Sequence, residues 1–215
     1  MGIAYRCEAG TVAGFVKQLA VSYIGHGYWF YVAGRTPPAK DPRLIDEKLI
    51  AKYGAAVSRA TRSRRKAAGL SNVHYIRHRD FFVLLATAGK HTFFEEERAT
   101  IRDAREVPVK YSGYSISFRG GHPSVRIEDQ LYRDLKAYYS EIAVHRSGEW
   151  LEAELGKLRF EPYAPIRRQL LAILREVNRR RDAAGSEAVP KNCLQLGRHL
   201  SPPFGTAGNC RVYDE

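Results

Sequence analysis

The stretch 73-VHYIRHRDFFVLLA-86 decides the fold, because two segments that favour strands are separated by only a few polar residues. Residues 73–77 and 81–86 are rich in branched and aromatic side chains, which suit a pleated surface. The connection through His78, Arg79 and Asp80 leaves room only for a tight turn, which joins antiparallel neighbours. The stretch therefore predicts a β-hairpin and, with it, a sheet built around that hairpin.

Further elements are expected on both sides of the hairpin. Strand-like composition predicts further strands at residues 28–33, 107–111, 114–118 and 125–127. Apolar side chains recur at helical spacing over residues 11–24. Asp41 as N-cap and Pro42 at the first helical position predict a second helix, which ends before Gly54. From Glu128 onward the pattern is helical.

The order of these elements predicts an α+β fold, with a mostly antiparallel sheet packed with helices in the N-terminal part and a helical C-terminal part. We expect residues 1–127 to form an α+β nucleic-acid-binding core with a basic helix. Residues 128–184 are expected to form a helical region packed on that core, or one continuous domain with it. Residues 185–215, which contain several glycines and prolines, are expected to form an irregular tail.

Composition narrows the class of protein. The chain has 215 residues, a formal net charge of +12 and a hydrophobic share of 44%, which is ample for a packed core. Its cysteines, Cys7, Cys193 and Cys210, are odd in number and form no CxxC pair, which argues against a disulfide framework and a structural zinc site. No apolar run is long enough to span a bilayer. We expect a cytoplasmic protein without membrane contact.

The most informative charged feature lies between Glu47 and Asp80, where the chain has no acidic residue. Within it, Ser58 to Ala68 predicts a helix that is rich in arginine, poor in apolar side chains and terminated by Gly69. A solvated helix normally intersperses acids for i,i+4 pairing, and this one has none. Such a positive field attracts polyanions, of which nucleic acid is the commonest in a cell.

The leading hypothesis is therefore a protein that binds DNA or structured RNA through the phosphate backbone. A role in a mobile element or in phage defence suits such a protein. Tyr75 and His74 are candidates for stacking on a base. The candidate nucleic-acid-binding residues are Arg59, Arg62, Arg64, Arg65, Lys66, His74, Tyr75, Arg77, His78, Arg79, Arg119, His122, Arg179, Arg180 and Arg181.

An enzyme is the alternative hypothesis. Metal-dependent cleavage of a phosphodiester needs two or three carboxylates at one point and a group that handles the proton. The candidate catalytic residues are Asp80, Glu106 and Lys110, and the candidate metal ligands are Asp80, Glu95 and Glu96. The leading hypothesis needs no cofactor, whereas this alternative needs Mg²⁺. A third hypothesis is a basic subunit that binds an acidic protein partner.

Overall fold

The computed structural model describes residues 4–197, 202–204 and 209–211, and the chain divides into two compact units. The first unit comprises Met1–Val109, Ile116–Ser124 and Ser201–Glu215, and the second comprises Lys110–Ser115 and Val125–Leu200. The α+β class expected from the sequence is confirmed, since strands predominate early in the chain and helices late.

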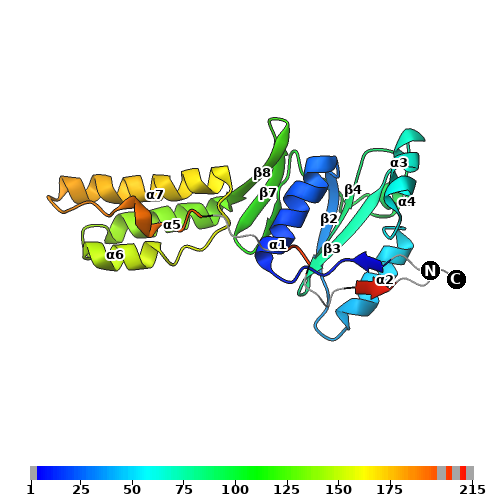
Figure 1. The fold of residues 1–215 in the computed structure, drawn as a ribbon, viewed down its shortest axis with the longest axis horizontal. Coiled ribbons are helices and arrows are strands. Elements are labelled where there is room, and N and C mark those ends of the chain that lie inside the picture. Colours follow the sequence, from blue (N-terminus) through cyan, green and yellow to red (C-terminus); the bar gives the residue numbers. More distant parts are fainter. Residues whose placement is uncertain (1–3, 198–201, 205–208, 212–215) are drawn as a thin grey trace. The chain divides into compact units, whose positions relative to one another are not determined.

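The elements of the first unit follow one another as sheet strands with intervening helices (Figure 1). They are β1 (Ala4–Arg6), α1 (Val12–Lys17), β2 (Phe30–Arg35), α2 (Pro42–Lys52), α3 (Arg59–Ala67), β3 (Val73–His78), β4 (Phe81–Ala86), α4 (Thr92–Glu96), β5 (Arg102–Asp103) and β9 (Asn209–Arg211). Helix α1 continues as a π-helical segment over Gln18–Tyr23 and a 3-10 turn over Ile24–His26. The helix expected over 11–24 is thus present, with a widened middle.

The predicted hairpin is confirmed and occupies one side of a four-stranded antiparallel sheet with the order β3-β4-β2-β5. Its register pairs Val73 with Ala86 at one end and His78 with Phe81 at the other. Arg79 closes the turn with a φ of 55°. Strands β1 and β9 form a separate antiparallel pair, and the chain after β1 joins the outer edge of β3 in parallel.

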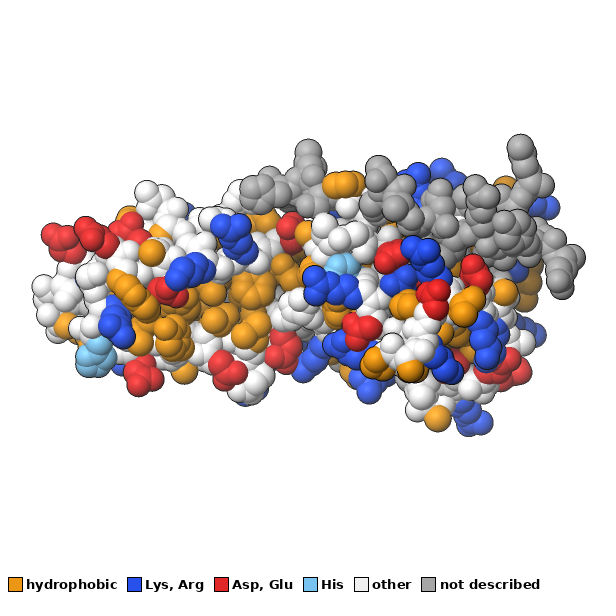
Figure 2. All heavy atoms as spheres, turned by 90° about the horizontal axis from the view of Figure 1, so that it is seen from below, with side chains coloured by type: hydrophobic (Ala, Val, Ile, Leu, Met, Phe, Trp, Pro, Cys, Tyr) orange, Lys and Arg blue, Asp and Glu red, His pale blue; other side chains and the backbone are white. Residues whose placement is uncertain are grey.

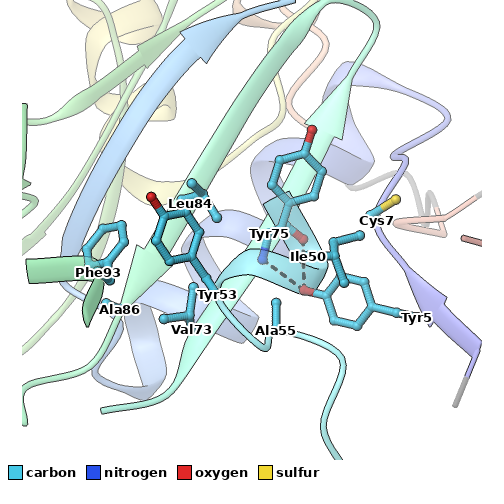
Figure 3. Packing of buried hydrophobic residues seen from close by; sticks show 10 residues of the cluster. All are labelled: Tyr5, Cys7, Ile50, Tyr53, Ala55, Val73, Tyr75, Leu84, Ala86 and Phe93. Atoms are coloured by element: carbon cyan, nitrogen blue, oxygen red, sulfur yellow. Dashed lines mark hydrogen bonds between the residues drawn. The ribbon is translucent and has the colours of Figure 1, made fainter. Parts of the chain in front are cut away.

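Helices cover both faces of this sheet. Alternate residues of each strand point to opposite faces, so each face has its own set of contacts. On one face, Phe15 and Tyr23 from the α1 region lie against the rings of His78 and His74. On the other face, a buried cluster joins α2 and α4 to β3 and β4. It comprises Tyr5, Cys7, Ile50, Tyr53, Ala55, Val73, Tyr75, Leu84, Ala86 and Phe93 (Figure 3). Helix α2 has the expected Asp41 cap and Pro42, although Leu44 is 66% exposed and takes no part in the core.

A buried ion pair joins α2 to β3. Asp46 is fully buried, and its carboxylate accepts hydrogen bonds from Nε and Nη2 of Arg77 at 2.9–3.0 Å. The hydroxyl of Tyr75 donates to the same carboxylate at 2.5 Å, and the thiol of Cys7 donates at 3.7 Å. These bonds offset the large desolvation penalty of a buried carboxylate. Burial and the negative charge of Asp46 together raise the pKa of Tyr75.

Tyr5 replaces a missing strand partner at the edge of β3 (Figure 3). Its hydroxyl donates to the carbonyl of Tyr75 at 2.9 Å and accepts from the amide of Tyr75 at 2.8 Å. Farther along the same edge, the amide and carbonyl of Arg77 bond to the backbone of Cys7 and Ala9. One phenol therefore bonds both backbone groups of Tyr75 on the side of β3 that has no neighbouring strand.

The second unit contains three helices, α5 (Asp129–Ile142), α6 (Gly148–Leu155) and α7 (Ala164–Ala183), followed by a 3-10 turn over Lys191–Cys193. A three-stranded sheet of β6 (Val109–Tyr111), β7 (Tyr114–Arg119) and β8 (His122–Ile127) contributes residues to both units. Gln169 ties α7 to the end of β8, because its amide group bonds both the N–H and the C=O of Ile127. No helix in the described part of the chain is long and apolar enough to cross a membrane.

The buried ion pair yields the first prediction. Asp46→Asn leaves the guanidinium of Arg77 buried without its counter-charge, which costs about 3–5 kcal/mol of unfolding free energy. Urea denaturation followed by circular dichroism measures the loss. Asp80→Asn is the matched control, because it removes one partner of the exposed Arg35–Asp80 pair and leaves the midpoint nearly unchanged. Equal midpoints for the two variants would contradict the role assigned to Asp46.

The phenol of Tyr5 yields the second prediction. Tyr5→Phe keeps the ring but orphans the amide and carbonyl of Tyr75, so we expect a loss of about 1–3 kcal/mol. Tyr138→Phe serves as control, since that side chain is 47% exposed on α5 and its hydroxyl makes no hydrogen bond within the described residues. The same urea titration distinguishes them, and a Tyr5→Phe midpoint equal to the wild-type value refutes the bridge.

Candidate nucleic-acid interface

Helix α3 is the arginine-rich helix expected from the sequence, and its ends form as predicted. The hydroxyl of Ser58 accepts a hydrogen bond from the amide of Thr61 at 3.1 Å, which caps the N-terminus. Gly69 follows the helix with a φ of 70°, a conformation that favours glycine. None of the helical residues is buried. Its stability therefore depends on the few contacts that hold it to the rest of the unit.

Two of the arginines in α3 hold the helix in place instead of facing solvent. The guanidinium of Arg62 donates to the carbonyl of Ala55 at 2.9 Å, and that of Arg65 donates to the carbonyl of Gly54 at 3.4 Å. These carbonyls follow the C-terminus of α2, where positive charge is favoured. The side-chain amide of Asn72 donates to the carbonyl of Arg62 at 3.0 Å. Helix α3 is thus fixed to both α2 and the start of β3.

The other basic side chains of α3 face away from the unit. Arg59, Arg64 and Lys66 are exposed, and the ion pairs of the described chain include none of them. Some exposed cations elsewhere in the unit are neutralised locally, as in the Lys52–Glu96 and Arg105–Asp103 pairs. On the face shown in Figure 2, Lys and Arg of the first unit lie beside Asp and Glu. The outer face of α3 therefore carries cations that form no ion pair with any described acid.

Lys90 extends this surface and was missed in the sequence. Leu70 and Lys90 form a parallel bridge, and the amide of Ser71 bonds the carbonyl of Lys90 at 3.1 Å. Lys90 is exposed, directly beside the C-terminal end of α3. The hairpin could have revealed it: because β3 and β4 are antiparallel, the residues after β4 must return to the residues before β3.

Three of the predicted contact residues are instead part of the core, and this corrects the sequence interpretation. Tyr75 is fully buried with its hydroxyl on Asp46, so its ring has no surface on which a base could stack. Arg77 is 3% exposed and is held by Asp46 and Glu8. His78 is 5% exposed, with its ring against Phe15. Strand β3 is thus largely buried although it is an edge strand of its sheet, and its polar side chains serve packing.

His74 lies inward of α3 in a cluster of tyrosine rings. Its ring stacks on Tyr23 with centroids 4.3 Å apart, and Tyr28 lies at 4.7 Å. Its Nδ1 is 3.1 Å from the hydroxyl of Tyr5. Burial, followed by the positive charge of Arg62, lowers the pKa of His74 to about 3. His74 is therefore neutral near pH 7, and its ring packs β3 against the α1 region.

The remaining predicted contact residues of the first unit lie away from α3. Arg79 is at the opposite end of β3, about 17 Å distant for a six-residue strand. Arg119 and His122 flank the Gly120-Gly121 turn of the β7–β8 hairpin, where both glycines have positive φ. The amide of Phe118 bonds the carbonyl of Ala104 just after β5, at the sheet edge opposite β3. These residues are exposed, but they do not join α3 in one surface.

The Arg179 to Arg181 triplet in the second unit makes local contacts within that unit. Arg179 and Arg180 both pair with Glu176, at 2.7 and 3.2 Å. Arg181 is buried, and its guanidinium donates to the carbonyls of Ala143, Arg146 and Glu187. Arg181 thus holds the ends of α5 and α7 together, which corrects its assignment as a contact residue.

The carboxylates proposed for metal binding do not converge. Asp80 pairs with Arg35 at 2.6 Å, at the end of the sheet where Arg35 pairs with Phe81. Residues Asp103 to Glu106 and helix α4 lie at the other end, where Phe30 pairs with both Ala86 and Asp103 and packs on Phe94. A whole strand length, about 17 Å, separates the two groups.

Other partners occupy the rest of the proposed catalytic set. Glu96 pairs with Lys52, and Lys110 pairs with Glu128 in the second unit, both at 2.6 Å. Glu95 and Glu106 are exposed, and Glu95 lies in the first turn of α4. Across the described ranges, no group of three or more His, Cys, Asp or Glu side chains could hold a metal ion.

The fold and this surface define an α+β protein with a positively charged helix on its first unit. The chain matches no protein-family model and resembles no curated protein sequence significantly.

The neutral His74 yields a third prediction. Its folded-state pKa is about 3, whereas the ordinary value is 6.5, so between these values the unfolded chain binds a proton that the folded protein does not. Each pH unit below 6.5 then removes about 1.4 kcal/mol of stability. His74→Phe retains the stacking but removes this component. Urea midpoints at pH 7 and pH 4.5 measure it, and an acid-induced loss as large as that of the wild type contradicts the assignment.

Proposed function

We propose that the protein binds nucleic acid through the outer face of α3, with Arg59, Arg64, Lys66 and Lys90 on the phosphate backbone. The observation that carries this proposal is that these cations are exposed and free of ion pairs within the described chain, while Arg62 and Arg65 hold the helix still. A fixed row of cations loses little conformational entropy on binding, because the backbone that bears them is already ordered.

Backbone contact suits the chemistry of the surface. Phosphates are recognised by Arg and Lys whatever the base sequence, and each contact releases condensed counterions. The net charge of +12 attracts a polyanion at long range as well. A cytoplasmic setting is part of this proposal.

The salt dependence of binding tests the proposal. Affinity for a labelled DNA or RNA is measured by anisotropy at several salt concentrations, for the wild type and for Arg59→Ala/Arg64→Ala/Lys66→Ala. If each cation contacts one phosphate, the log–log slope becomes shallower by about 2–3 units in the variant.

The matched control removes the same charge from elsewhere on the first unit. Lys17, Lys40 and Arg43 are also exposed and make no ion pair among the residues described. Lys17→Ala/Lys40→Ala/Arg43→Ala keeps the wild-type slope if α3 is the interface. Equal slopes for both triple variants would exclude α3. Absence of any retention at low salt refutes nucleic-acid binding and favours an acidic protein as partner.

A further inference from the structure

The exposed half of α3 carries a central row of small side chains with cations on either side of it. Successive residues turn by about 100° around a helix. Thr61, Arg62 and Arg65 are half-buried and mark the side that faces the unit. The diametrically opposite side is formed by Ala60, Ser63 and Ala67, all exposed. This outermost side of the helix, which we call the crest, therefore consists of its smallest side chains.

Cations flank this crest on both sides. By the same geometry, Arg59 and Lys66 lie on one side of the crest and Arg64 lies on the other. All three are exposed. The helix thus presents a slim, uncharged crest between two positively charged flanks, and a flat layer of phosphates would not match this shape. A groove bounded by phosphates on both sides does match it.

Of the nucleic-acid forms, B-form DNA has a groove of the required size. Its major groove is about 12 Å wide and admits an α-helix, whose diameter with side chains is about 10–12 Å. The major groove of an RNA duplex is too narrow for side chains to enter. Single strands are usually held by stacking on exposed rings. Among the described residues of the first unit no Phe, Tyr or Trp side chain is exposed, and the half-buried ones are Trp29, Phe30, Phe82, Phe94, Phe118 and Phe204.

We propose that α3 docks in the major groove of B-form DNA, with Ala60, Ser63 and Ala67 toward the base edges and the flanking cations on the phosphates of opposite strands. This inference rests on the proposed function and specifies its ligand. The crest offers one hydroxyl and otherwise only methyl groups, so it carries little hydrogen-bonding information about sequence. Binding is accordingly set by duplex form and by phosphates, with weak preference among sequences.

Modified duplexes test the groove directly. The probes are one 20-base-pair DNA, the same duplex with glucosylated 5-hydroxymethylcytosine, which fills the major groove without changing charge, and a duplex with bulky groups on guanine N2, which fill the minor groove. We expect at least tenfold weaker binding to the glucosylated duplex and unchanged binding to the minor-groove duplex. Single-stranded DNA and double-stranded RNA of the same sequence are expected to bind at least tenfold more weakly.

A protein variant makes the same test from the other side. Ala60→Leu/Ala67→Leu enlarges the crest without changing charge or helix propensity greatly, and we expect at least tenfold weaker duplex binding. Ala153→Leu, at an exposed position of α6, is the matched control and retains wild-type affinity. Circular dichroism verifies that both variants fold.

The outcomes separate the two proposals. Equal, salt-dependent binding to plain and glucosylated duplexes, or tighter binding to single strands, overturns docking in the groove but leaves phosphate binding by α3 intact. Failure to bind any of the probes at low salt overturns both.

Discussion

The buried contact between Asp46 and Arg77 is the interaction on which the rest of the first unit depends. It places a charge of each sign in the core, so either one alone would be too costly to bury. Because Asp46 belongs to α2 and Arg77 to β3, the pair fixes the helix against the sheet. Tyr75 and Cys7 share the same carboxylate, which brings the chain after β1 to the same point.

This arrangement explains why a continuous basic stretch in the sequence has divided roles in the fold. Arg77 is neutralised in the core and Arg62 and Arg65 bind carbonyls after α2, whereas Arg59, Arg64 and Lys66 are exposed on the outer side of α3. A sequence does not distinguish an arginine that holds a helix in place from an arginine that is available to a ligand. They differ in whether the chain offers them an acceptor, and that depends on tertiary structure.

Much of the architecture could be predicted because its signals are local. The hairpin, the caps of α2 and α3 and the Gly69 stop each depend on neighbouring residues. The candidate site was harder to predict, because the burial of Tyr75 and Arg77 depends on Asp46, some thirty positions away. In the sequence, Asp46 appears as one more polar residue of an amphipathic helix. Lys90 depends on a bridge to Leu70. Such long-range pairings leave no mark in composition or periodicity, and only the antiparallel hairpin could have indicated the position of Lys90.

The phenol of Tyr5 has a further consequence for association between molecules. Strand β3 is the outermost strand of its sheet, and an outermost strand with free amides and carbonyls is a template for any passing extended chain. Here the segment after β1 covers the backbone of Arg77, and the phenol covers that of Tyr75. The sheet is thus closed to growth on that side by one short segment and one side chain, which protects the protein from edge-to-edge aggregation.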